Sequence, residues 1–370
     1  MSTQPEHGAD KRKSTSAMAP RNLARLCLTY ALAGFAGYLA TLIGMPLPWM
    51  LGPFFFLTAV SVLGYISPIV PMGRELGQVA IGLAVGMRFT PAVLLATATL
   101  VPHMLVSTLY VIAYTFVAAL LIKPLARIDS VSAFFATAAG GVADMASVSK
   151  EYGGDPGSVA IVHAMRVALV VAVVPFLVFF LGDHGTAPAS TEVGSTNYLS
   201  LIIALGLAYL VAVALKPTPL PNPWLVGPIL TGMVLGVSEI LVVQVPSTLI
   251  IVAQIMLGTW LGSQFKRSLL VRLPRVTISA MVAASFMILC AGIGAFVLSY
   301  FGQMPYATSF LALAPAAVTE MVLTAKVMNL DAETVTAFHV MRIAVVSSTV
   351  LLVFKLYMRM KGSEIGPGIQ

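Results

Sequence analysis

Charged side chains are scarce in this 370-residue sequence. Asp, Glu, Lys and Arg together make up 9% of it, whereas an average soluble domain contains about 25%. Hydrophobic residues instead reach 58%, and the mean hydropathy is +0.94. A soluble fold cannot bury this much apolar surface, and a disordered chain would carry far less of it. The composition excludes an ordinary cytosolic enzyme and predicts a polytopic, all-helical membrane protein whose first partner is the lipid bilayer.

Cysteine and histidine are also rare. The two cysteines, Cys27 and Cys290, both lie inside apolar runs, which excludes a disulfide framework and a CxxC metal site. Only five histidines are present, and a copper oxygenase needs clustered His ligands. We therefore expect no enzymatic activity, no metal and no cofactor.

Nucleotide-binding motifs are missing as well. The sequence contains neither a Walker A motif nor a Gly-x-Gly-x-x-Gly pattern before a helix, and its polar loops are short. The formal net charge of +7 is compatible with nucleic-acid binding in a soluble protein. Since no loop is long enough for a DNA-binding domain, we expect no direct nucleic-acid partner.

Long apolar runs dominate what is present, and they form two sets of six. The first set is 22–44, 49–66, 72–89, 94–122, 130–149 and 157–181; the second is 198–215, 224–243, 248–265, 275–300, 307–328 and 334–357. A spanning helix needs about 20 such residues. The expected division is a disordered cytosolic tail over 1–21, a membrane repeat over 22–181, an external linker over 182–197, a second membrane repeat over 198–360 and a cytosolic tail over 361–370.

The second set repeats the first. A shift of 176 residues aligns 133–170 with 309–346 without a gap, and thirteen of the 38 positions are identical. Matches of Ala or Val mean little in so apolar a chain, but rarer residues match too. These pairs are Lys150 with Lys326, Asp155 with Asp331, His163 with His339, Arg166 with Arg342 and, outside the window, Gln78 with Gln254. The chain is a tandem repeat.

The distribution of Lys and Arg indicates that the two repeats are inverted. Cytosolic loops carry an excess of these residues, and the 182–197 linker has neither. If 130–149 and 307–328 do not cross as ordinary helices, 17 of the 21 Lys and Arg residues lie on the cytosolic side, with Arg88 and Lys326 outside. We expect two inverted repeats of about five spanning helices plus one re-entrant or broken segment each. Both termini would be cytosolic, in the bacterial inner membrane.

Each of these two segments carries a helix-breaking signal next to an acid. Gly140 and Gly141 precede Asp144 in the first repeat, and Pro315 precedes Glu320 in the second. Irregular backbone at membrane depth is tolerated only where it is buried in protein or lines a wet cavity. A re-entrant loop and a discontinuous crossing helix both fit this pattern.

A candidate site follows from the acid and a His-x-x-Arg motif on the next helix. Its members are Asp144, His163 and Arg166 in the first repeat and Glu320, His339 and Arg342 in the second. Residues i and i+3 share one helix face, so each His and Arg point the same way. Ionisable groups inside a membrane are costly and mark functional paths by default. The alternative is a structural salt bridge between each acid and the nearby Arg.

Two further matched pairs have structural interpretations. Gln78 and Gln254 stand beside glycines spaced for close helix packing, at 82 and 86 and at 258 and 262, and either join helices or contact a substrate. Asp155 and Asp331 each precede an apolar helix and are predicted to be N-caps.

The chain resembles the bacterial AbrB membrane family in two paired stretches, AAGGVADMASVSKEYGGDPGSVAIVHAMRVALV and LAPAAVTEMVLTAKVMNLDAETVTAFHVMRIAVV, with LPWMLGP and NPWLVGP upstream. The resemblance covers nearly all of residues 22–360. Members are described as ammonia monooxygenases or as regulators of gene expression. The arrangement is similar, more distantly, to secondary transporters of the glutamate and citrate symporter type. That similarity implies inverted halves of five spans with a Gly-Gly re-entrant loop, a motif replaced here by Ala316-Ala317 in the second half.

Three functions follow from these features, with secondary transport favoured. A transporter would carry a small, in one interpretation anionic, solute past Arg166 and Arg342, while Asp144 and Glu320 bind the coupling proton or cation. The second is an indirect role in regulating gene expression, and the third and weakest is the monooxygenase. The expected partners are the solute and its coupling ion, and a homodimer remains open.

Overall fold

The computed structural model describes residues 20–181 and 197–360, except 219, 221, 239, 242, 266, 268–270 and 272. Within these ranges every regular element is a helix. Six helices are long and apolar enough to cross a membrane: α1 (Pro20–Leu42), α5 (Val101–Ala126), α8 (Pro156–Phe180), α9 (Tyr198–Leu215), α13 (Pro274–Gly302) and α16 (Ala332–Met360). The two predicted tails and the 182–197 linker fall almost wholly outside the described residues.

By the criteria of length and composition, six of the described helices could span a membrane, fewer than the expected five or so in each repeat. Four apolar helices are only 14–17 residues long: α2 (Pro48–Val62), α3 (Gly73–Gly86), α10 (Pro223–Ser238) and α11 (Ser247–Ser263). α3 and α4 (Pro91–Thr99) meet at a bend of 91°, and counting them as one span gives up to seven. Apolar runs overstate helix length here because apolar residues also occupy the turns, as at Leu63 and Tyr65 beyond the end of α2.

The run predicted at 94–122 is divided between two helices. α4 begins at Pro91, where the Thr90 hydroxyl accepts a hydrogen bond from the Val93 amide at 3.3 Å, and it ends at Thr99. α5 starts at Val101 with Pro102 in its first turn. Proline has no amide hydrogen and suits the first turn of a helix, so the sequence favours a new start there.

Both segments predicted to be broken are broken. The first repeat has α6 (Ser130–Thr137) and α7 (Val142–Glu151), and the second has α14 (Tyr306–Leu313) and α15 (Val318–Val327). Ala138 and Ala314, which end α6 and α14, adopt ψ of 143° and 136°. For Ala314 the extended backbone is expected because Pro315 follows it.

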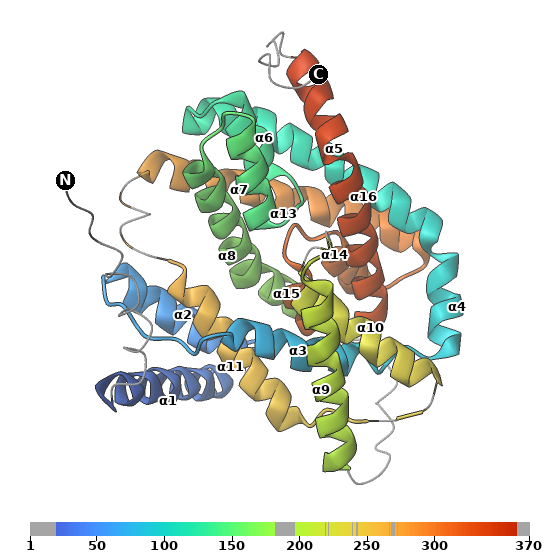
Figure 1. Ribbon diagram of the computed structural model, residues 1–370. Helices are drawn as coiled ribbons and strands as arrows, with labels where there is room; N and C mark the ends of the chain where they lie inside the picture. The colour runs from blue at the N-terminus through green and yellow to red at the C-terminus, as the bar shows by residue number, and fades with distance from the viewer. Residues whose placement is uncertain are drawn as a thin grey trace, which may run out of the picture.

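The same order of helices therefore occurs twice, with α1–α3 and α5–α8 matched by α9–α11 and α13–α16 (Figure 1). We call α1–α3 with α9–α11 the paired group, because α2 packs on α11 and α3 packs on α10. We call α5–α8 with α13–α16 the broken-helix group. It lies above the paired group in Figure 1, and α3 contacts its helices α15 and α16.

Glycines set the close spacing inside the paired group, as their sequence spacing predicts. A Cβ on Gly82 would lie 2.9 Å from the Leu225 carbonyl oxygen of α10, and one on Gly262 would lie 2.6 Å from the Phe54 carbonyl oxygen of α2. Contacts this short to a carbonyl oxygen cannot be relieved by moving a side chain, because the backbone itself would have to shift. Each glycine thus permits a helix crossing that any larger residue would push apart.

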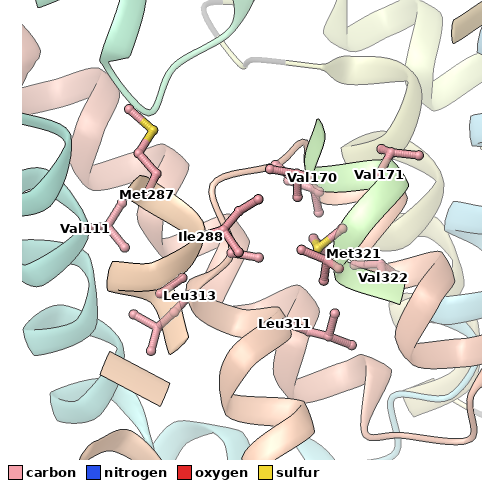
Figure 2. Packing of buried hydrophobic residues seen from close by; sticks show 14 of the residues in the cluster. Val111, Val170, Val171, Met287, Ile288, Leu311, Leu313, Met321 and Val322 are labelled. Atoms are coloured by element: carbon pink, nitrogen blue, oxygen red, sulfur yellow. The ribbon is translucent and has the colours of Figure 1, made fainter. Parts of the chain in front are cut away.

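An apolar core fills the broken-helix group. Figure 2 shows side chains from five helices converging in it: Val111 of α5, Val170 and Val171 of α8, Met287 and Ile288 of α13, Leu311 and Leu313 of α14, and Met321 and Val322 of α15. All are at least nine-tenths buried. The core holds both breaks against long helices of both repeats.

Candidate functional site

The His-x-x-Arg motif of the first repeat binds the end of the broken helix. His163 and Arg166 lie one turn apart on α8 and are 0% and 6% exposed. Arg166 Nη1 donates to the carbonyl oxygens of Thr137 and Ala138 at 3.1 and 3.0 Å, and His163 Nε2 is 2.9 Å from the carbonyl oxygen of Phe135. These three carbonyls lie in the last turn of α6 and in the break.

The second repeat has the same arrangement. Arg342 donates to the carbonyl oxygens of Ala314 and Ala316 at 2.8 and 2.9 Å, and His339 Nε2 is 2.9 Å from the carbonyl oxygen of Leu311. His339 is 0% and Arg342 5% exposed. The two broken helices are therefore held by equivalent side chains.

Each histidine has one defined tautomer in this geometry. A carbonyl oxygen only accepts, so Nε2 of His163 and of His339 carries the hydrogen. Nδ1 is then the acceptor for Arg166 Nη2 at 2.9 Å and for Arg342 Nη2 at 2.6 Å.

The His-x-x-Arg motif supplies hydrogen-bond donors to the carbonyl groups at the end of each broken helix. A helix that stops leaves its last carbonyls without partners and carries partial negative charge at that end. Arg166 and Arg342 supply both donors and positive charge there. Tyr114 of α5 adds another donor, since its hydroxyl lies 2.9 Å from the Leu313 carbonyl oxygen.

The alternative interpretation, a structural salt bridge between each acid and its nearby arginine, is not found among the described residues. Within the described part of the chain the structure has one ion pair, between Arg88 and Glu333, and it includes neither Asp144 nor Glu320. The motif spacing correctly places His and Arg on one face. It does not reveal that backbone carbonyls, rather than carboxylates, occupy the space in front of that face.

The two acids differ in their surroundings. Asp144 is exposed, whereas Glu320 is 8% exposed and its Oε2 atom has no hydrogen-bond partner among the described residues. Beside Glu320, the Thr319 hydroxyl accepts a 3.0 Å hydrogen bond from Gln78 Nε2 of α3.

The glutamines and glycines singled out in the sequence also differ between repeats. Gln78 joins α3 to α15, so its prediction as a helix-joining residue is supported by a contact. Gln254 is 4% exposed, and its Oε1 has no partner among the described residues. Gly140 and Gly141 lie in the first break, where Cβ atoms would meet the Met145 side chain at 2.7 Å and the Asp144 carboxylate at 2.7 Å. Their lack of side chains lets both groups fold over the start of α7.

The N-cap predictions are confirmed. Asp155 accepts hydrogen bonds from the Gly157 and Ser158 amides at 3.1 and 2.9 Å, and Asp331 accepts one from the Thr334 amide at 2.9 Å. Hydrogen bonding from the Ser158 hydroxyl, at 2.6 Å, lowers the pKa of Asp155 below its ordinary value. These acids fix where α8 and α16 begin, and with them the positions of the His-x-x-Arg motifs.

Sequence comparison between the repeats matched Lys326 with Lys150 but missed Arg88 and Glu333, which the structure brings into contact. Arg88 pairs with Glu333, and Lys326 Nζ donates to the Ala84 carbonyl oxygen at 3.3 Å. Arg88 aligns with Gln264, and Glu333 aligns with Gly157. Searching for matched residues discards such positions, and the loss of a match was itself the available signal.

Six candidate spans, two internally broken segments and buried ionisable groups define a multi-pass helical protein of the membrane class. The chain belongs to the AbrB family, whose model, described as "Transition state regulatory protein AbrB", matches residues 2–122 and 68–358. It is similar to "Uncharacterized protein YhjN" of Bacillus subtilis (strain 168), with 26% identity covering 90% of this chain and 93% of that protein. It is also similar to "Putative regulator AbrB" of Escherichia coli (strain K12), with 24% identity covering 86% of this chain and 91% of the relative.

Proposed function

We propose that the protein is a secondary transporter of a small solute in the bacterial inner membrane, with both termini cytosolic and two inverted repeats. The observation that carries this proposal is the carboxylate of Glu320. It is buried at the start of α15, next to a break, and one of its oxygens has no partner among the described residues. A group so costly to bury is retained where it binds something.

The duplicated architecture supports the proposal. Secondary transporters are commonly built from internal repeats whose discontinuous helices meet at the substrate site. Here the helix order occurs twice, and each copy has a break held by a His-x-x-Arg motif. In the paired group, helices of one repeat pack on helices of the other: α2 packs on α11, and α3 packs on α10. Such exchange of partners is the pattern expected for two repeats related by a twofold axis.

The side chains suggest a division of roles. Glu320 and Asp144 would bind the coupling proton or cation, because carboxylates suit both. The solute would meet the two breaks, and Gln78 of α3 binds Thr319 beside the second of them. Arg166 and Arg342 each keep a buried Nε donor without a partner among the described residues. An anionic solute suits these donors.

The test is transport by purified protein in proteoliposomes, with small carboxylic acids as solutes and a pH or sodium gradient as the driving force. We expect uptake that collapses with the gradient and is lost in Glu320→Gln. Glu75→Gln is the matched control, since Glu75 is a half-buried acid in the first turn of α3. Equal uptake by wild type and Glu320→Gln would contradict the coupling role.

The names of the family model and of the E. coli relative favour a second candidate, an effect on gene expression. We propose that any such effect is indirect and follows from solute levels, with no enzymatic step. Transcript changes that persist in a strain carrying a transport-dead Glu320→Gln protein would favour a separate regulatory role.

A further inference from the structure

The two breaks are not equally accessible. α15 is buried from Val318 to Ala325, whereas on α7 the residues Val142, Asp144, Ser147 and Lys150 are exposed. The equivalent half-helices of two matched repeats thus have opposite surroundings. α15 is covered by α3 of the paired group.

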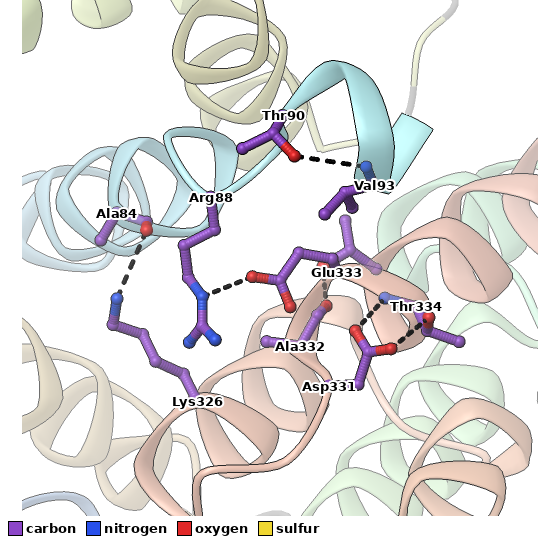
Figure 3. A network of polar contacts seen from close by, with 10 residues as sticks. Ala84, Arg88, Thr90, Val93, Lys326, Asp331, Ala332, Glu333 and Thr334 are labelled. Carbon is purple, nitrogen blue, oxygen red and sulfur yellow. Dashed lines mark hydrogen bonds and ion pairs between the residues drawn. The ribbon is translucent and has the colours of Figure 1, made fainter. Parts of the chain in front are cut away.

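Two polar contacts hold α3 against α15 and α16, and each side supplies the cation of one of them (Figure 3). Arg88, just beyond the end of α3, forms an ion pair with Glu333 in the first turn of α16, and their side chains are 28% and 8% exposed. In the other direction Lys326, in the last turn of α15, donates to the Ala84 carbonyl at 3.3 Å. That carbonyl lies in the last turn of α3, where a cation is favoured by the helix dipole.

N-terminal caps fix the backbone next to Glu333 and next to Arg88. Asp331 accepts hydrogen bonds from the amide and hydroxyl of Thr334 at 2.9 and 2.6 Å, which sets the start of α16 and the position of Glu333. Thr90, two residues after Arg88, caps α4. The bend of 91° between α3 and α4 leaves Arg88 at a corner that faces α16.

The first repeat cannot form the same closure. The counterpart of Glu333 is Gly157 and that of Arg88 is Gln264, which is exposed and donates to Trp260 of its own helix at 3.4 Å. Lys150, the counterpart of Lys326, is exposed. The two repeats therefore differ at these positions in sequence as well as in conformation.

We propose that Arg88–Glu333 and Lys326–Ala84 form a one-sided latch that closes the access route to the α14–α15 break while the route at α7 stands open. This inference rests on the proposed transport function, since a latch on one of two routes is what alternating access requires. On the orientation predicted from Lys and Arg, the latch faces the external side. Opening it would expose Thr319 and Glu320, and the solute would then reach the buried acid.

Cysteine labelling tests the latch without knowledge of the solute. In full-length protein in nanodiscs, with Cys27 and Cys290 replaced by alanine, single reporters are introduced as Thr324→Cys on α15 and Ser147→Cys on α7. A maleimide should label the exposed α7 reporter quickly and the buried α15 reporter slowly. Glu333→Gln, which keeps the shape of the side chain, should speed labelling of the α15 reporter about fivefold, the effect of losing a modest ion pair.

The controls separate a latch from general loosening. Gln264→Ala, at the equivalent of Arg88, should leave both rates unchanged, and the charge swap Arg88→Glu with Glu333→Arg should restore slow labelling at the α15 reporter. An unchanged α15 rate in Glu333→Gln would overturn the proposal, and so would an equal acceleration at both reporters. If labelling behaves as expected but no solute is taken up in proteoliposomes, the latch stands and the transport function falls.

Discussion

Replacing Arg342 with methionine should be among the most damaging single changes in the chain. Methionine matches the length of the aliphatic stem but has no donor. The carbonyls of Ala314 and Ala316 lose partners at 2.8 and 2.9 Å, and His339 Nδ1 loses one at 2.6 Å. The Ala314 carbonyl keeps the Ala316 amide as a donor at 2.9 Å, so the atoms left without a donor are the Ala316 carbonyl oxygen and His339 Nδ1. Each such buried atom costs about 1–3 kcal/mol, and the free energy of unfolding should therefore fall by roughly 2–6 kcal/mol.

The assay is unfolding of the purified protein in mixed micelles by titration with sodium dodecyl sulfate, followed by circular dichroism. Arg275→Met is the control. Arg275 also donates to a carbonyl, that of Leu125, at 2.7 Å, but it is exposed and water can replace it. We expect a loss below about 1 kcal/mol there. If Arg342→Met costs no more than Arg275→Met, the carbonyls at the break are hydrated, and the reasoning from buried backbone is refuted.

Three further outcomes can be checked with similar material. Gly82→Ala should lower the free energy of unfolding by about 1–3 kcal/mol because its Cβ meets backbone at 2.9 Å, whereas Gly34→Ala, with no atom within 4 Å of the new Cβ, should raise it by up to about 1 kcal/mol; equal effects would argue against close packing at α3. The pKa of Asp155 is lowered in the folded protein, so its stabilising effect is complete above the ordinary carboxyl pKa and is lost as the pH falls through the folded value. Asp155→Asn should therefore exchange amide hydrogens faster at the start of α8 at pH 7, and a difference from wild type that persists undiminished below about pH 3 would contradict this. Thr191→Cys, with the native cysteines replaced, should react with an impermeant maleimide in intact cells, and protection until lysis would mean that the repeats are parallel.

Much of the architecture could be predicted because its signals are local. Gly140 and Pro315 predict the breaks, Asp155 and Asp331 predict helix starts, and the glycines at 82 and 262 predict close crossings. Each of these depends on backbone conformation or on missing side-chain volume, which a few neighbouring residues decide.

The rest depends on contacts that sequence patterns do not encode. Carbonyl oxygens are the same in every residue, so no pattern shows that Arg166 and Arg342 bind backbone. The difference between exposed Asp144 and buried Glu320 arises from how α3 packs on one half-helix, which is a property of the whole fold. Helix length was overestimated for α2 and α3 because apolar turns continue the apolar runs.

The tautomer of the two histidines limits what they can carry. In His163 and His339 one ring nitrogen is bound to a carbonyl and the other to an arginine, so neither ring has a free nitrogen for a solute or a metal. A second proton on either ring would set two donors against each other at Nδ1, and the bond to arginine would break. A proton that crosses this protein would therefore have to do so without either imidazole, and both rings keep the role of fixed links between an arginine and a helix end.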